Sequence, residues 1–160
     1  MTTFRILVLV STTFFCADSF AHKDTQSYAD RIETFATQKT FSEVLFEINF
    51  AITQHNFRIT SRANLSKGVR ERGHNDFPSF EIIHLCNLEL AREALEIDPG
   101  YVVYMPCKIT IHEQGDTTVI SIVKLPENHR DQRLEVFAKN VNQQLVNIVR
   151  FAASFEGIEQ

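Results

Sequence analysis

Two cysteines and one histidine are the residues of this chain best suited to chemistry. His84 and Cys86 are two positions apart, so they project from the same face if that segment is an extended strand. Together with Cys107 they offer one imidazole and two thiolates, a donor set that suits copper, zinc or the iron of haem. No fourth ligand is evident in the sequence, so the metal set is incomplete.

The cysteine pair also permits two interpretations without a metal. In an oxidising compartment, two thiols with no third partner favour one disulfide, which would stabilise the fold by roughly 3 kcal/mol. Alternatively the thiols react, because Asn87 is a good helix N-cap and a helix beginning after Cys86 would favour its thiolate. The chain lacks a Cys-x-x-Cys motif, which weighs against a redox enzyme.

The N-terminus predicts a secretory signal, and hence a periplasmic or secreted protein. Arg5 precedes an apolar run over residues 6–15, and Ser19-Phe20-Ala21 provides small residues for cleavage after Ala21. The run is too short to span a bilayer, which needs about 20 residues, and no second run predicts a transmembrane segment. We therefore expect a cleaved signal at 1–21, a flexible segment at 22–30, a single domain at 31–155 and a tail at 156–160.

Composition restricts the function classes further. The net charge of −4 argues against general nucleic-acid binding. No catalytic-triad order, phosphate loop or metalloprotease motif is present, so the sequence favours a binding protein over an enzyme.

The elements that must position the cysteines follow from periodicity, capping and turn signals. The pattern predicts strand, helix, strand, short helix, strand, helix, two strands and a final helix. The strands are expected at 31–38, 57–65, 80–86, 101–112 and 117–125, and the helices at 40–55, 66–72, 88–97 and from 131 onward. This order predicts a two-layer α+β domain, with one mainly antiparallel sheet packed against helices.

Two local expectations accompany these elements. Ser66 is expected to cap the short helix. Phe46 and Phe50 widen the apolar stripe of the 40–55 helix, and we expect them in the core, with a pocket or a dimer seam as the alternative.

The segment around the cysteines resembles domain-of-unknown-function family 302. The residues that carry the resemblance occur in order: Cys86-Asn87, Leu90-Ala91, Ala94-Leu95, Asp98-Pro99 and Met105-Pro106-Cys107. Leu88 and Met105 depart from the family pattern, which usually has Pro and Leu there. The resemblance implies a fold similar to TATA-binding-protein-like domains, often as homodimers, and no established activity. In that arrangement the strands that carry Cys86 and Cys107 share one sheet, so their sulfurs could meet.

From these observations we expect a binding module for a small ligand or a protein partner, centred on Cys86 and Cys107. The candidate ligand-binding residues are His84, Cys86, Asn87, Pro106 and Cys107. A thiol-dependent redox protein is one alternative. A metal- or haem-binding protein that uses His84, Cys86 and Cys107 is the other, although no cofactor is expected by default.

Overall fold

The computed structural model describes residues 27–154. The predicted signal peptide, including Cys16, and the predicted tail lie outside the described residues. The described part of the predicted flexible segment contains Tyr28, whose ring lies against the guanidinium of Arg31 at 5.4 Å.

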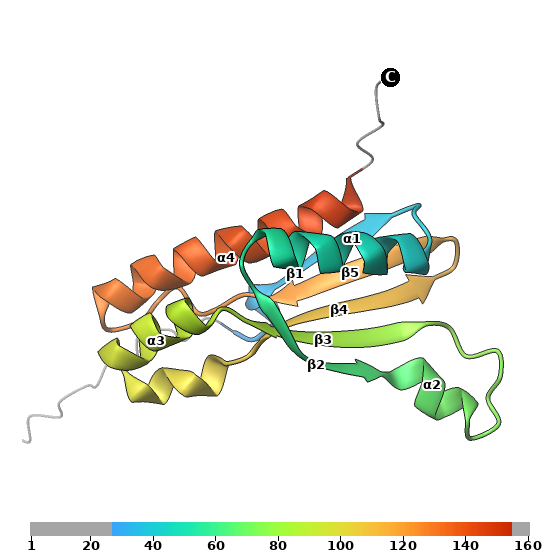
Figure 1. The fold of residues 1–160 in the computed structure, drawn as a ribbon, viewed down its shortest axis with the longest axis horizontal. Coiled ribbons are helices and arrows are strands. Elements are labelled where there is room, and N and C mark those ends of the chain that lie inside the picture. The colour runs from blue at the N-terminus through green and yellow to red at the C-terminus, as the bar shows by residue number, and fades with distance from the viewer. Residues whose placement is uncertain (1–26, 155–160) are drawn as a thin grey trace, which may run out of the picture.

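A two-layer α+β architecture is confirmed (Figure 1). The five strands are β1 Ile32–Thr37, β2 Arg58–Asn64, β3 Phe80–Cys86, β4 Cys107–Gln114 and β5 Thr117–Val123. They form one antiparallel sheet in the order β1-β5-β4-β3-β2. The helices are α1 Phe41–Gln54, α2 Leu65–Arg70, α3 Leu88–Ile97 and α4 Gln132–Ala153, with short 3-10 helices η1 Ala29–Arg31 and η2 Pro99–Tyr104.

Only one face of the sheet carries the core. The apolar side chains that alternate toward α1 and α4 are fully buried: Ile83, Leu85, Ile109, Ile111, Ile120 and Ile122. The opposite face, which we call the open face, lies away from α1 and α4 and carries polar side chains beside apolar ones such as Val119. The hydroxyls of Thr34 and Ser121 form a 3.0 Å hydrogen bond on it. Helices on one face therefore leave a second face on which a ligand could lie.

Most predicted helix starts are confirmed by their capping bonds, but the predicted cap of α2 is wrong. Thr40 and Glu43 form the capping box of α1, and Asp131 caps α4. At α2 the side chain of Asn64 accepts a bond from the Lys67 amide, so Asn64 is the cap. Ser66 is buried instead, and its hydroxyl donates to the carbonyl of Phe80 at 3.3 Å.

The predicted strand 101–112 is wrong in its first part. Pro99 occupies the start of η2, and the carboxylate of Asp98 accepts a 2.8 Å bond from the Gly100 amide. These contacts favour a tight helical turn, and β4 begins only at Cys107, after a cis Met105–Pro106 peptide bond. Val102 and Val103 resemble part of a buried strand in sequence, yet their side chains are exposed.

The expectation that Phe46 and Phe50 lie in the core is also wrong. Their side chains are 74% and 51% exposed, and the ring of Phe50 lies 5.8 Å from that of Phe151 on α4. The face of α1 that packs in the core is formed by smaller buried residues, namely Val44, Ile48, Ala51 and Ile52.

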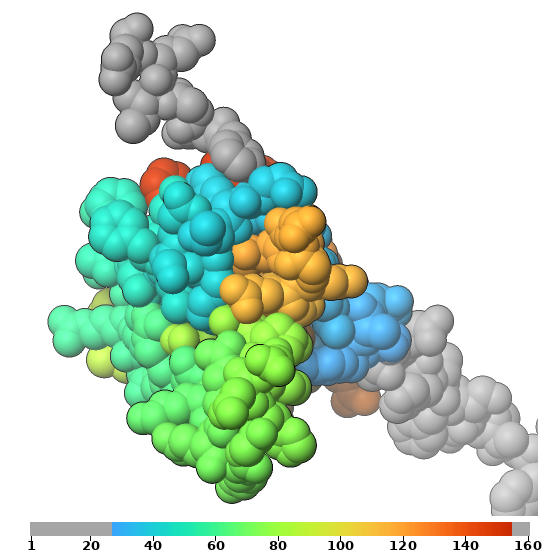
Figure 2. Space-filling model, turned by 90° about the vertical axis from the view of Figure 1, so that its right-hand side faces the viewer, coloured from blue at the N-terminus to red at the C-terminus, as the bar shows by residue number. Residues whose placement is uncertain are grey.

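The two ends of the sheet differ in character. At the end that bears the β4–β5 turn, α2 and its following loop project from the body of the molecule (Figure 2). The other end, where β3 ends at Cys86 and β4 begins at Cys107, bears α3 and η2 (Figure 1). None of the helices in the described part of the chain is both long and apolar enough to cross a membrane.

Candidate functional site

Cys86 and Cys107 lie on neighbouring strands at the same end of the sheet. Leu85 is the register partner of Cys107, so Cys86 lies one position beyond the last pair of β3 and β4. On its other side Cys86 is paired with Arg58 of β2. Both thiols are free in the structure.

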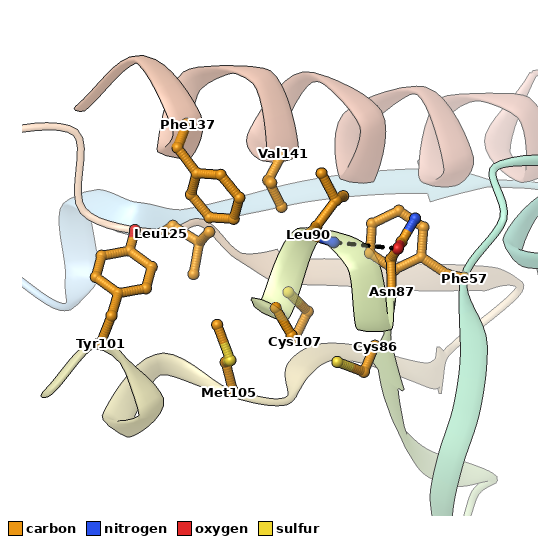
Figure 3. A pocket seen from close by; sticks show the side chains of 11 residues that line it. Phe57, Cys86, Asn87, Leu90, Tyr101, Met105, Cys107, Leu125, Phe137 and Val141 are labelled. Carbon is orange, nitrogen blue, oxygen red and sulfur yellow. Dashed lines mark hydrogen bonds between the residues drawn. The ribbon is translucent and has the colours of Figure 1, made fainter. Parts of the chain in front are cut away.

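The two thiols border one narrow apolar space, which we call the chamber (Figure 3). It is bordered by α3, α4 and η2, by the ends of β3 and β4, and by Phe57 and Leu125, which lie next to β2 and β5. Its lining residues are Phe57, Cys86, Asn87, Leu90, Ala91, Tyr101, Met105, Cys107, Leu125, Phe137 and Val141. The chamber has a volume of about 20 Å³, enough for roughly one water molecule.

A buried hydroxyl also borders the chamber. Tyr101 is 1% exposed, and its hydroxyl has no hydrogen-bond partner among residues 27–154. Its ring packs edge-on against those of Tyr104, His129 and Phe137, which fixes its position. The chamber is therefore apolar except for this hydroxyl, the thiols and the start of α3.

Burial keeps both thiols protonated near neutral pH. It raises the pKa of the Cys86 thiol, and it raises that of Cys107 to about 12, with a further contribution from negative charge on Cys86. The thiolate expected at the start of α3 is therefore not favoured. At the start of α3, it is the side chain of Asn87 that meets the helix terminus (Figure 3). Its side-chain oxygen accepts bonds from the amides of Glu89 and Leu90.

A larger space, which we call the cleft, lies beside Cys107 on the side of η1 and the open sheet face. Its volume is about 310 Å³. Its lining residues are Tyr28, Arg31, His84, Val103, Tyr104, Met105, Pro106, Cys107, Lys108, Val123, Lys124 and Leu125. Cys107, Met105 and Leu125 border both the chamber and the cleft.

The structure divides the predicted site residues between these two spaces. His84 and Pro106 line the cleft, Cys86 and Asn87 line the chamber, and Cys107 lines both. His84 is oriented by a 2.9 Å hydrogen bond between its Nδ1 and the Ser61 hydroxyl. Within residues 27–154, no three His, Cys, Asp or Glu side chains are grouped as a metal ion would require. The proposed donor set of His84, Cys86 and Cys107 is thus not assembled.

The cleft residues that the sequence did not identify include Tyr28 and three cations, Arg31, Lys108 and Lys124. The alternation of side chains around Ile109 places Lys108 on the open face, so the sequence did carry a signal for this one residue. Arg31 and Lys124 meet only because β1 pairs with β5, as the 2.9 Å bond from Arg31 Nη1 to the Lys124 carbonyl records. That pairing of distant strands could not be read from either segment alone.

Comparisons with known proteins agree with this fold. Residues 33–152 match the model of the family described as Domain of unknown function DUF302. A solved structure, that of the uncharacterized conserved protein DUF302 from Bacillus stearothermophilus, is similar with a TM-score of 0.69 and 18% identity. The similarity covers 78% of this chain and 98% of that one, and at this identity it shows a common fold alone. A comparison with curated proteins finds no match.

Proposed function

The chain belongs to the family of the domain of unknown function DUF302, and from that premise we propose that it is a binding module for a small ligand at the Cys107 end of the sheet. We further propose that it acts in the periplasm or after secretion, as the signal-like pattern of residues 1–21 predicts. The family resemblance supports a homodimer as the functional unit.

The observation that carries the proposal is the cleft. Its volume of about 310 Å³ lies at the lower end of the range of small-molecule sites, whereas the chamber has room for roughly one water. Three of the five candidate residues, His84, Pro106 and Cys107, converge on it. The ligand therefore binds in the cleft, and the residues that line the chamber pack behind Cys107.

The chemistry of the thiols favours binding over catalysis. A reactive cysteine needs a thiolate near neutral pH, whereas burial raises the pKa of both Cys86 and Cys107. A disulfide between the two residues, as the sequence predicts, would be compatible with binding in the cleft, because Cys86 does not line it.

The proposal can be tested by blocking the cleft. Val103 and Val102 are neighbours on η2 with 74% and 57% exposed side chains, but only Val103 lines the cleft. Val103→Trp should fill the mouth of the cleft, and Val102→Trp is its matched control. The measurement is a titration by NMR with benzoate, benzamide and benzylammonium, which span three charges on one ring.

We expect at least one of the three probes to shift the amide resonances of His84, Val103 and Lys108. Val103→Trp should weaken that binding by about tenfold or more, the loss of roughly 1.4 kcal/mol, and Val102→Trp should leave it unchanged. If no probe of any charge perturbs the cleft, or if the two tryptophan variants behave alike, the cleft is not the ligand site.

A further inference from the structure

The charges that face the cleft are unbalanced. Arg31, Lys108 and Lys124 line it, and no aspartate or glutamate does. Lys124 is compensated by Glu33, whose carboxylate lies 3.3 Å from its ammonium group. Arg31 and Lys108 form no ion pair with a carboxylate in the described part of the chain.

Arg31 is held in place rather than left free in solvent. Its guanidinium lies 5.4 Å from the ring centre of Tyr28 and 5.9 Å from that of Tyr104. One N–H is used by the carbonyl of Lys124 at 2.9 Å. A guanidinium has five N–H donors, so others remain available for a planar acceptor such as a carboxylate.

Lys108 is oriented by the same tyrosine. Its ammonium donates to the Tyr28 hydroxyl at 3.2 Å and lies 5.9 Å from the centre of that ring. Tyr28 therefore contacts both uncompensated cations, which places two positive charges around one ring at the edge of the cleft.

Apolar side chains complete the cleft beside these charges. Val103, Pro106 and Val123 line it together with the cations. We propose that the ligand is a small organic anion whose carboxylate or phosphate group binds Arg31 and Lys108 and whose apolar body lies on these three residues. This inference rests on the proposed function, because it names the ligand class of the same cleft.

The simplest competing explanation is an ordinary solvated basic surface. Surface lysines and arginines usually bind nothing specifically. Two features favour the anion site: the guanidinium of Arg31 lies 5.4 and 5.9 Å from two tyrosine ring centres, and the chain as a whole has a net charge of −4. In an acidic protein, two uncompensated cations in a concave site attract an anion that the rest of the surface repels.

The experiment compares probes of the same size that differ in charge. Benzoate and phenyl phosphate carry the two anionic head groups, benzamide is neutral and benzylammonium is cationic. We expect benzoate or phenyl phosphate to bind at least about tenfold more tightly than benzamide, as expected for one charge-assisted hydrogen bond. The anion affinity should fall as sodium chloride is raised.

Charge-removing variants identify the cations that matter. Lys108→Gln and Arg31→Gln should each reduce the anion affinity by about tenfold or more and leave benzamide binding unchanged. Lys67→Gln is the matched control, because Lys67 is 76% exposed on α2 and does not line the cleft. If Arg31→Gln does not fold, Lys108→Gln alone decides, since its side chain contributes only the contacts to Tyr28.

The outcomes separate this inference from the proposed function. Benzamide or benzylammonium binding in the cleft as tightly as the anions would overturn the anion inference and leave the binding function intact. Equal losses in Lys108→Gln and Lys67→Gln would overturn it as well, because they would indicate a general charge effect. No binding of any probe would overturn both.

Discussion

Cys107 is one of three residues, with Met105 and Leu125, that border both the chamber and the cleft. Burial raises the pKa of its thiol to about 12. A thiol that stays protonated near neutral pH is a poor nucleophile but a good apolar wall for a ligand site. At this scale the sequence left the cysteines open between a disulfide, a ligand set and a reactive pair. It could not show how deeply the thiols are buried, because the chamber is lined by residues from several segments, including Phe137 of α4.

The thiol pKa values predict the reactivity of the reduced protein. The thiolate is the form that attacks iodoacetamide and displaces iodide, so a raised pKa lowers the reactive fraction at pH 7 and the rate should increase as pH rises. Cys86 should react faster than Cys107, whose thiol is only half ionised at a pH of about 12. Peptide mass spectrometry after timed alkylation resolves each cysteine separately.

Protein unfolded in urea serves as the control, in which both cysteines should react at similar and higher rates. A fast reaction of Cys86 that is already independent of pH between 6 and 8 would contradict the raised pKa. It would restore the thiol-dependent redox interpretation.

At the scale of elements, the capping of α3 explains the role of Asn87. Asn87 was a candidate ligand residue, but its side-chain oxygen caps α3 through the amides of Glu89 and Leu90. The helix then closes the chamber with Leu90 and Ala91. Asn87 therefore contributes to the site by fixing the start of the helix.

Substitutions of Asn87 should thus change stability rather than binding. Asn87→Ala removes the acceptor and should reduce the free energy of unfolding by about 1 kcal/mol, whereas Asn87→Asp keeps an acceptor and should cost little. Urea unfolding measures both values, and benzoate titration should give the same affinity for Asn87→Asp as for the natural chain. An affinity loss in Asn87→Asp at unchanged stability would indicate direct ligand contact instead.

The helices and strands show where sequence patterns are sufficient to predict the bounds of an element. Strand β3 and helix α3 were predicted with their observed bounds, because strong local signals begin and end them. Residues 101–104 were misassigned because an apolar run does not reveal whether it is buried, and Val103 is exposed. The prediction that Phe46 lies in the core was wrong for the same reason, because the apolar stripe of α1 is wider than the face that the sheet and α4 can cover.

For the whole molecule, the family and the two-layer fold are shown, whereas location and assembly remain predictions. The order of elements was sufficient to predict the fold class, since each apolar helix stripe needed the sheet as a partner. The cleft was not predictable, because it combines η1, η2 and three strands whose adjacency depends on the strand order.

Secretion and dimerisation can be measured on one preparation. Expression with its own N-terminus in a Gram-negative bacterium should yield a periplasmic chain that begins at His22, as determined by intact mass under denaturing conditions. Sedimentation of the same sample should give twice that mass. A full-length chain in the cytoplasm would contradict the signal prediction, and a single monomer mass at micromolar concentration would contradict the dimer.

The position of β1 at the edge of the sheet constrains how the protein is made. Its strand partner within residues 27–154 is β5, and Thr34 contacts Ser121 across 87 positions of sequence. During synthesis from the N-terminus, β1 therefore waits unpaired until nearly the whole domain has emerged. Arg31 precedes β1 and reaches the cleft only when β1 pairs, through its bond to Lys124. A nascent chain that stops before β5 would hold both cysteines but could not assemble the cationic side of the cleft.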